Sequence, residues 1–328
     1  MKNYFIYILF LFPQVLAAQA AKTNFSSQDR KIGFIKEDNL DSLARKLAQL
    51  GSTDREKARA VFRWIAEHIS YNVRIYNRNR TDPGNFYEEP DDSSAALPSL
   101  NERVAAKVLK RKMAFCDGYS RLFAALCTKM GIPTEVIHGY ARTSQTRQGK
   151  FGVNHSWNAV YLENSWHLLD VTWASGFVSY SSQYIKQYND YYFLTPPADF
   201  FRDHYPEDIQ WALLDQLPLY REFNQAAFRH SGFNKYAIIS FIPQKGIIEA
   251  AAGDTIRFEI KTKKEIRNFL VADAYQPDSL LFLQPARYTV SGEKINFNYF
   301  VKGNEGGWLY LFFNEEAVLC YRFTLNKN

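Results

Sequence analysis

One cysteine, one histidine and one aspartate in this chain have the chemistry of a nucleophile, a base and an orienting acid. Cys116 begins a stretch, residues 116–130, whose apolar side chains recur at helical spacing, and Gly131 and Pro133 end that helix. The N–H groups and the dipole of a helix start favour negative charge, so a thiol there should ionise more easily than an ordinary one. The alternative is a structural role, because cysteine is among the most buried residue types.

His155 and Asp170 belong to two runs rich in aromatic and β-branched residues, 153–162 and 166–173. Three polar residues separate the runs, a pattern that predicts a β-hairpin. A two-residue turn at 163–164 would place His155 diagonal to Asp170 on one face, roughly 7–8 Å away. A turn of odd length would put them on opposite faces. Taken singly, His155 could be an ordinary core histidine and Asp170 an acceptor within the hairpin.

The three residues together predict a nucleophile, base and orienter set. His155 would take the thiol proton and return it to a leaving amine, and Asp170 would hold the imidazole and stabilise its charged form. His167 is the rival base, but it is three residues from Asp170 on the same strand and should face the other way. His138 and His204 lack the right neighbours in the sequence.

The residues that would support this set come from earlier helices and from nearby aromatic side chains. Leucine and other apolar spacing predicts helices over 38–50 and 58–71. The Cys116 backbone N–H is one natural oxyanion donor, and Tyr71, which follows the second helix, is the candidate for the other. Trp157 and Trp173 either line a cleft or pack in the core, and we favour the core.

The order of these motifs resembles the transglutaminase-like superfamily, whose members share a papain-like core. The likeness covers roughly residues 55–215, and its last part resembles the kyphoscoliosis-peptidase branch. The segments that carry it are 61–65, 69–72, 115–119, 131–133, 154–158, 169–173, 192–196 and 204–214. The resemblance implies an α+β fold with the nucleophile helix packed on an antiparallel sheet, and a triad of Cys116, His155 and Asp170.

Two features depart from the common pattern of that superfamily. Residues 113–115 before the cysteine are not glycine-rich, and a polar insert occupies about residues 77–99. Four acidic residues of this insert are candidates for binding calcium, namely Glu88, Glu89, Asp91 and Asp92. Because their spacing fits no EF-hand loop, we interpret the insert as a disordered acidic surface loop.

The first twenty residues have the pattern of a signal peptide. Lys2 precedes an apolar run over 4–16 that is too short for a membrane span, and Ala18-Gln19-Ala20 forms a small-x-small cleavage site. The mature chain should begin near Ala21 and be exported to the periplasm or the exterior. No later segment is apolar and long enough to predict a span.

Charge and cysteine content narrow the classes of partner. The formal charge of +6 favours an anionic surface such as the cell envelope, but no basic run is dense enough to predict nucleic-acid binding.

The chain has three cysteines, an odd number. Cys116 and Cys127 lie about 16 Å apart along one helix and cannot form a disulfide with each other. Cys127 and Cys320 are expected in the core, and a disulfide between them is not expected.

From about Lys235 the chain changes to short alternating runs punctuated by Gly, Asn and Asp, which is typical of a β-sandwich. The predicted strands are 256–261, 268–272, 294–300, 308–313 and 318–324. We therefore expect a signal peptide (1–20), a transglutaminase-like cysteine enzyme domain (21–225) and an immunoglobulin-like β-sandwich (226–328). No catalytic set falls in the last part, so we expect a structural or binding module there.

These observations predict an exported cysteine enzyme that acts on amide bonds of peptides or proteins through a thioester. The resemblance favours peptide hydrolysis, with acyl transfer to an amine, and hence protein cross-linking, as one alternative. The other alternative is a non-catalytic binding or scaffolding protein on the same fold, against which a complete triad argues. The expected partner is a peptide or protein substrate, and this chemistry requires no cofactor or metal.

Overall fold

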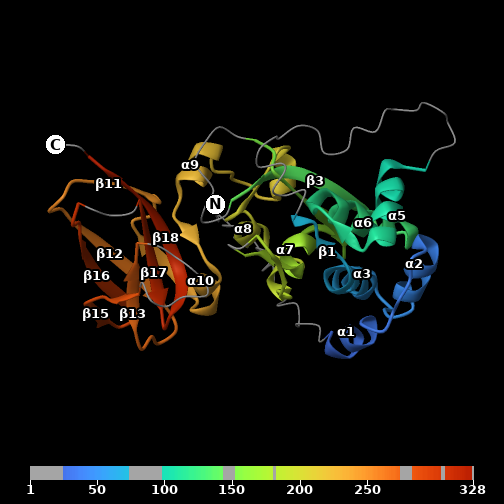
Figure 1. Ribbon diagram of the computed structural model, residues 1–328, viewed down its shortest axis with the longest axis horizontal. Helices are drawn as coiled ribbons and strands as arrows, with labels where there is room; N and C mark the ends of the chain where they lie inside the picture. The colour runs from blue at the N-terminus through green and yellow to red at the C-terminus, as the bar shows by residue number, and fades with distance from the viewer. Residues whose placement is uncertain are drawn as a thin grey trace, which may run out of the picture.

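The computed structural model describes residues 25–73, 98–142, 152–179, 182–273, 283–303 and 307–326 (Figure 1). The expected signal peptide lies outside these residues, as does the polar insert up to residue 97 with its four acidic calcium candidates. Within the described ranges, no helix combines the length and the apolar character that crossing a bilayer demands.

The first half of the chain contributes a group of helices around the one that begins at the cysteine. They are α1 (Ser26–Ile32), α2 (Leu40–Ala48), α3 (Asp54–His68), α5 (Leu100–Arg111) and α6 (Cys116–Lys129). Thr53 and Glu56 form a reciprocal capping box at the start of α3. Gly131 ends α6 with a φ of +75°, and Ile132 N–H donates to the Cys127 carbonyl at 3.0 Å. This left-handed cap confirms the predicted helix end.

Helix α6 packs on a four-stranded antiparallel sheet, and this contact sets the position of the site. The sheet order is β5 (Ser165–Leu169), β4 (His155–Leu162), β3 (Thr134–Ala141) and β8 (His204–Pro206). Leu122 and Leu126 of the helix share one buried cluster with Val160 and Leu169 of the sheet. The buried Asn158 amide donates to the backbone carbonyls of Ser120 and Glu135, both at 3.0 Å. The predicted α+β arrangement of a helix on an antiparallel sheet is therefore present.

The predicted hairpin has a turn of two residues, the length that places His155 and Asp170 on one face. Leu162 pairs with Ser165, and the two turn residues, Glu163 and Asn164, both have positive φ, at 52° and 63°. Two consecutive positive φ angles are the geometry of a type I′ turn, whose twist suits a two-residue hairpin. His155 and Asp170 consequently fall on one face.

The second predicted strand, 166–173, is wrong beyond Leu169. Residues Val171–Ser175 form a short helix, α7, instead of continuing β5. The Asp170 side chain accepts the Trp173 N–H at 3.0 Å, so the aspartate caps this helix. If the strand continued past Leu169, Asp170 Oδ1 would lose the Trp173 N–H as its donor. The helix start supplies that donor three residues later.

Shorter elements connect the sheet to the rest of the chain. They are β1 (Ser70–Tyr71), β2 (Met113–Ala114), β6 (Gly176–Val178), β7 (Tyr184–Lys186), η1 (Asp190–Tyr192), α8 (Pro197–Phe200), η2 (Ile209–Ala212), α9 (Tyr220–Gln225) and α10 (Ser231–Lys235). The pair that bears on the site is β1 and β2, which run parallel, with Tyr71 opposite Ala114. This pairing brings the end of α3 beside the residues that precede Cys116.

Two sheets face each other in the last part of the chain, drawn orange to red in Figure 1. One has the order β10 (Ile238–Ile242), β12 (Thr255–Thr262), β16 (Lys294–Phe300) and β15 (Tyr288–Ser291). The other has the order β11 (Ile247–Ala250), β18 (Glu316–Leu325), β17 (Trp308–Phe313), β13 (Phe269–Ala272) and β14 (Gln284–Pro285), and β9 (Phe228–Arg229) also pairs with β18.

Aromatic side chains from both sheets fill the space between them, including Phe258 and Phe297 of one sheet and Phe269, Phe313 and Tyr321 of the other. All five predicted strands are present, and β9, β10, β11, β14 and β15 were not predicted. The boundary at 225/226 and the immunoglobulin-like assignment stay predictions.

Candidate active site

Cys116 is the first residue of α6 and is almost completely buried, with 3% of its surface exposed. The chain reaches it by a short path from α5, which ends at Lys112 in a left-handed conformation. Parallel pairing holds this path, because Ser70 N–H donates to the Lys112 carbonyl and Asn72 N–H to the Ala114 carbonyl, at 2.9 and 2.8 Å. The first-turn N–H groups of α6 have no acceptor within the helix and surround the cysteine backbone.

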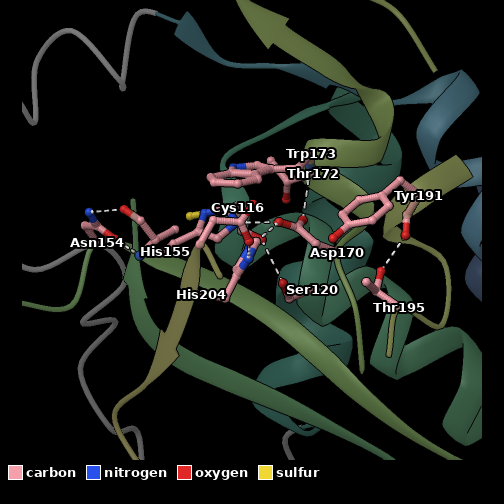
Figure 2. Close-up of polar contacts among 12 residues, drawn as sticks. Cys116, Ser120, Asn154, His155, Asp170, Thr172, Trp173, Tyr191, Thr195 and His204 are labelled. Carbon is pink, nitrogen blue, oxygen red and sulfur yellow. Dashed lines mark hydrogen bonds and ion pairs between the residues drawn. The ribbon is translucent and has the colours of Figure 1, made fainter. Parts of the chain in front are cut away.

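His155 is the first residue of β4, and its neighbour Asn154 fixes the entry into that strand. The Asn154 amide pairs with both the N–H and the carbonyl of Ala141, at 2.7 and 3.0 Å (Figure 2). His155 Nε2 lies 2.7 Å from Asp170 Oδ2, and the Cys116 sulfur is close enough to the ring to help raise the pKa of His155. Because Nε2 faces the carboxylate, Nδ1 is the nitrogen left for the sulfur. The structure thus places Cys116, His155 and Asp170 close together, and their role as a catalytic triad stays a prediction.

Asp170 sits at the end of β5 with none of its surface exposed. Oδ2 lies within hydrogen-bond distance of both His155 Nε2 and His204 Nε2, and Oδ1 accepts the Trp173 N–H. Burial alone would raise the pKa of Asp170, but the charges and hydrogen bonds of the two histidines hold this pKa far below its usual range. A buried carboxylate with three donors remains ionised.

The pKa of His155 responds to its surroundings in the opposite direction. Burial would lower the pKa of this imidazole, but the Asp170 carboxylate and the Cys116 sulfur together raise it to about 9. The protonated ring is therefore the favoured form at neutral pH. An imidazole that holds a proton beside a sulfur can stabilise a thiolate and later protonate a leaving amine.

The prediction that His204 lacks suitable neighbours is wrong. It lies on β8, which pairs with β3 so that His204 stands opposite Ala141, and it is 1% exposed. Its Nε2 is 3.1 Å from Asp170 Oδ2, and its Nδ1 is 2.6 Å from Asp203 Oδ1. The adjacent Asp203 was a visible signal, but the contact with Asp170 depends on a strand pairing that joins residues far apart in the chain.

Aromatic rings enclose the His204 imidazole on several sides. Phe200 stacks on it with ring centroids 4.1 Å apart, and the rings of Trp173 and Trp157 lie at 4.5 and 5.0 Å. Trp157 is buried as predicted, and it fits because position 139 is glycine. A Cβ on Gly139 would lie 2.5 Å from the indole of Trp157, which no real contact allows. Trp173 is half-buried and lies over both histidines (Figure 2).

The other predicted residues fall where they do not compete with this set. His167 pairs with Val160 and bonds to Ser165 Oγ at 3.0 Å, away from Asp170 as expected. His138 bonds to Ser156 Oγ at 2.9 Å. Tyr71 packs its ring against Phe115, the residue before the nucleophile, with centroids 5.4 Å apart. Its role as an oxyanion donor stays a prediction.

The remaining two cysteines lie in apolar surroundings. Cys127 and Cys320 are buried and unpaired, so they form no disulfide. Burial raises the pKa of each thiol to about 12. Both findings confirm their predicted place in the core.

His155, Asp170 and His204 are also the residues that come nearest to a set of metal ligands. Within the described part of the chain, one donor atom from each lies within 4.8 Å of the others. The two histidine nitrogens in question, however, both point at the same carboxylate oxygen, which is the pattern of a hydrogen-bonded network. The three side chains therefore form a hydrogen-bonded network around the Asp170 carboxylate.

Comparison with known proteins supports the family resemblance inferred from the motifs. Residues 41–171 match the model of the transglutaminase-like superfamily. Human kyphoscoliosis peptidase is 34% identical over 220 residues, which cover 65% of this chain and 30% of that protein. Hillarin of Drosophila melanogaster is 30% identical over 211 residues, covering 60% of this chain and 23% of its own length. This chain thus spans less than a third of the length of either relative.

The matched residues, 41–171, include Cys116, His155 and Asp170 but end before His204. They also include α6 and the three strands β3, β4 and β5, which together position the site. The chain therefore contains a domain of the transglutaminase-like superfamily.

Proposed function

We propose that this chain is an exported cysteine-nucleophile enzyme that hydrolyses amide bonds of peptides or proteins through a thioester. The observation that carries the proposal is the connected set at the start of α6. The Cys116 sulfur lies close enough to His155 to help raise the pKa of that ring, and Nε2 of the ring lies 2.7 Å from the buried Asp170 carboxylate. A nucleophile, a base and an orienting acid in this order match the requirements of covalent acyl chemistry.

In the proposed reaction His155 already holds the proton of Cys116, so a thiolate stands beside an imidazolium, and the sulfur forms a bond to the carbonyl carbon of the amide. The C–N bond breaks, the leaving amine takes the proton from His155, and an acyl thioester remains. Water then adds to the thioester carbon after giving a proton to His155. The C–S bond breaks, the sulfur leaves as a thiolate beside the protonated His155, and a carboxylic acid is released. Asp170 keeps the ring oriented and stabilises its charged form.

Negative charge develops on the carbonyl oxygen during both steps. The Cys116 N–H at the start of α6 is the first proposed donor to that oxygen. Tyr71 is the second, because β1 places it beside the residues that lead into the nucleophile. Replacing Tyr71 by Phe keeps the ring and removes the hydroxyl, so this substitution separates an oxyanion role from packing.

Hydrolysis is favoured over amine transfer because the relative at 34% identity is named a peptidase. Acyl transfer would share every step up to the thioester and differ only in the attacking group. A scaffold without turnover is the alternative from another class. It has no need of a buried, ionised Asp170 joined to a cysteine through an imidazole.

The test is to incubate the purified mature chain and its Cys116→Ala variant with a peptide library, with and without a primary amine. Cleaved peptides with new carboxylates from the unaltered chain alone support hydrolysis. Products that carry the added amine would favour acyl transfer. If no product forms and an electrophilic amide mimic leaves Cys116 unmodified, the scaffold role replaces the enzyme.

Export is proposed from the leader-like residues 1–20. N-terminal sequencing of the protein recovered from the periplasm or the medium should begin within a residue or two of Ala21. Recovery of the chain with Met1 intact, from the cytoplasm only, would contradict export without touching the proposed chemistry.

A further inference from the structure

His204 lies between two carboxylates, a position that the nucleophile, base and orienter set does not require. Its Nε2 is 3.1 Å from Asp170 Oδ2, and its Nδ1 is 2.6 Å from Asp203 Oδ1. The ring is 1% exposed and is stacked on Phe200. Both ring nitrogens therefore face acceptors in a place that water scarcely reaches.

The protonation state of His204 follows from these two contacts. A neutral imidazole has one N–H donor, whereas two carboxylates that both accept from one ring require protons on both nitrogens. Burial would lower the pKa of His204, but Asp203 and Asp170 together raise it to about 9. The hydrogen-bond geometry and the charges thus agree on a cation.

The groups that face this cation decide what it does. The titratable groups around His204 are Asp170, Asp203, His155 and the ring of Tyr192, whose centroid is 6.2 Å away. A second cation, Arg142, also interacts with Asp203. The His155 ring is 5.5 Å from the His204 ring and bonds to the same oxygen of Asp170. Two imidazoles consequently share one carboxylate oxygen.

We propose that His204 is a positively charged positioning residue that holds Asp170 Oδ2 toward His155 and moderates the charge that Asp170 exerts on His155. The catalytic consequence rests on the proposed function, but the charge of His204 does not. A positive ring beside Asp170 offsets part of the carboxylate charge and repels a second positive ring. It therefore keeps His155 from holding its proton too tightly, and a base whose pKa lies nearer the working pH transfers protons more readily.

The decisive variants separate charge from hydrogen bonding. His204→Gln keeps an N–H that can donate to Asp170 but carries no charge, and His204→Ala removes both. His138→Gln, which alters a histidine on the neighbouring strand β3, is the matched control. Asp203→Asn removes the outer acceptor charge and serves as a second route if the substitutions at His204 do not fold.

The first measurement uses no turnover. In the Cys116→Ala background, nitrogen NMR should find protons on both nitrogens of His204 at pH 7.5. The apparent pKa of His155 should rise by about one unit with His204→Gln and stay in place with His138→Gln. Asp203→Asn should lower the pKa of His204. A neutral His204 at that pH, or a His155 pKa that does not rise with His204→Gln, would overturn the proposal.

The second measurement adds turnover in the chain that retains Cys116. With His204→Gln, kcat should stay within about tenfold and the basic limb of the rate profile should move upward. With His204→Ala, kcat should fall by about a hundredfold, since Asp170 also loses its donor. If both variants lost kcat equally and the basic limb of the pH–rate profile stayed in place, the role of His204 would be structural only. If the unaltered chain has no turnover, the proposed function fails, and the NMR result alone decides the charge of His204.

Discussion

The two ends of α6 carry two cysteines that are almost equally buried but have very different neighbours. Cys116 is 3% exposed at the first residue, and Cys127 is fully buried eleven positions later. Burial raises the pKa of Cys127 to about 12, opposed only by a hydrogen bond to Thr134. Cys116 instead lies near the His155 imidazole, whose Nε2 is 2.7 Å from the buried Asp170 carboxylate. Exposure therefore does not distinguish a nucleophile from a core thiol, whereas the neighbouring strand does.

The contrast arises because the helix crosses the sheet from its polar end to its apolar middle. Near Cys116, α6 faces the ends of β4 and β5, where His155 and Asp170 are placed. Farther along, Leu122, Leu126 and Cys127 join the main core cluster. One helix thus supplies both the proposed nucleophile at its start and, farther along, the apolar side chains that pack in the core.

The largest expected effect comes from removing each thiol in turn. Cys116→Ala should lower turnover by at least about 10⁴-fold, because the nucleophile is lost, and should leave the thermal midpoint nearly unchanged. Cys127→Ala should retain turnover and lower the free energy of unfolding by about 1 kcal/mol through a small cavity. Peptide cleavage assays and thermal melts measure both. A Cys127→Ala chain that is stable but inactive would contradict the assignment of Cys127 to the core and of Cys116 as the nucleophile.

The next effect tests the carboxylate that is proposed to orient His155. Asp170→Asn should lower kcat by about 10³–10⁴-fold, because the amide no longer fixes the imidazole tautomer. Asp208→Asn, which alters an aspartate that caps η2 outside the site, is the control. Circular dichroism should establish that the Asp170→Asn chain is folded. Activity within tenfold of the unaltered chain would remove Asp170 from its orienting role.

A smaller effect is the selectivity of alkylation among the three thiols. A pKa of about 12 leaves only about one thiolate in 10⁵ at pH 7 for Cys127 and Cys320. Iodoacetamide should therefore modify Cys116 first, as read by mass spectrometry of the folded protein. His155→Ala should slow this labelling by about tenfold or more, while His167→Ala should not. Equal labelling of Cys116 and Cys127 would contradict an activated nucleophile.

The smallest expected effect concerns stability between pH 6 and 9. The pKa of His155 and that of His204 both lie at about 9, above the ordinary value of about 6.5. Their stabilisation is therefore fully present below about pH 6.5 and is lost as the pH rises through about 9. The corresponding loss for Cys127 begins above its ordinary thiol value of about 8.5 and extends to about 12, so this window reports mainly the histidine end.

Urea unfolding at pH 6 and pH 9 measures this effect. The free energy of unfolding should be lower at pH 9 by about 1 kcal/mol or more. His204→Gln should shrink the difference, and His138→Gln should leave it as it was. A protein that is equally stable or more stable at pH 9 would show that the histidines are not held as cations in the folded state.

Local rules are enough to determine several features of this protein. The start of α6 at Cys116 and its end at Gly131 follow from apolar spacing and from the left-handed cap that glycine permits. The placement of His155 and Asp170 on one face follows from the two-residue turn, because side chains alternate along a strand. These features depend on residues close together in the chain, so periodicity predicts the helix, and the face of the hairpin follows once the turn has two residues.

Contacts between distant segments were decided by the tertiary structure alone. His204 reaches Asp170 only because β8 adds to the far edge of β3, and the rings of Trp157 and Trp173 meet it there. Strands such as β10 and β11 also went unpredicted, because their pairing partners lie elsewhere in the chain. The sequence determined which residues supply the nucleophile, the base and the carboxylate candidates. Long-range strand pairing decided that the carboxylate is shared between two histidines, since no local pattern specifies which strand lies at the edge of a sheet.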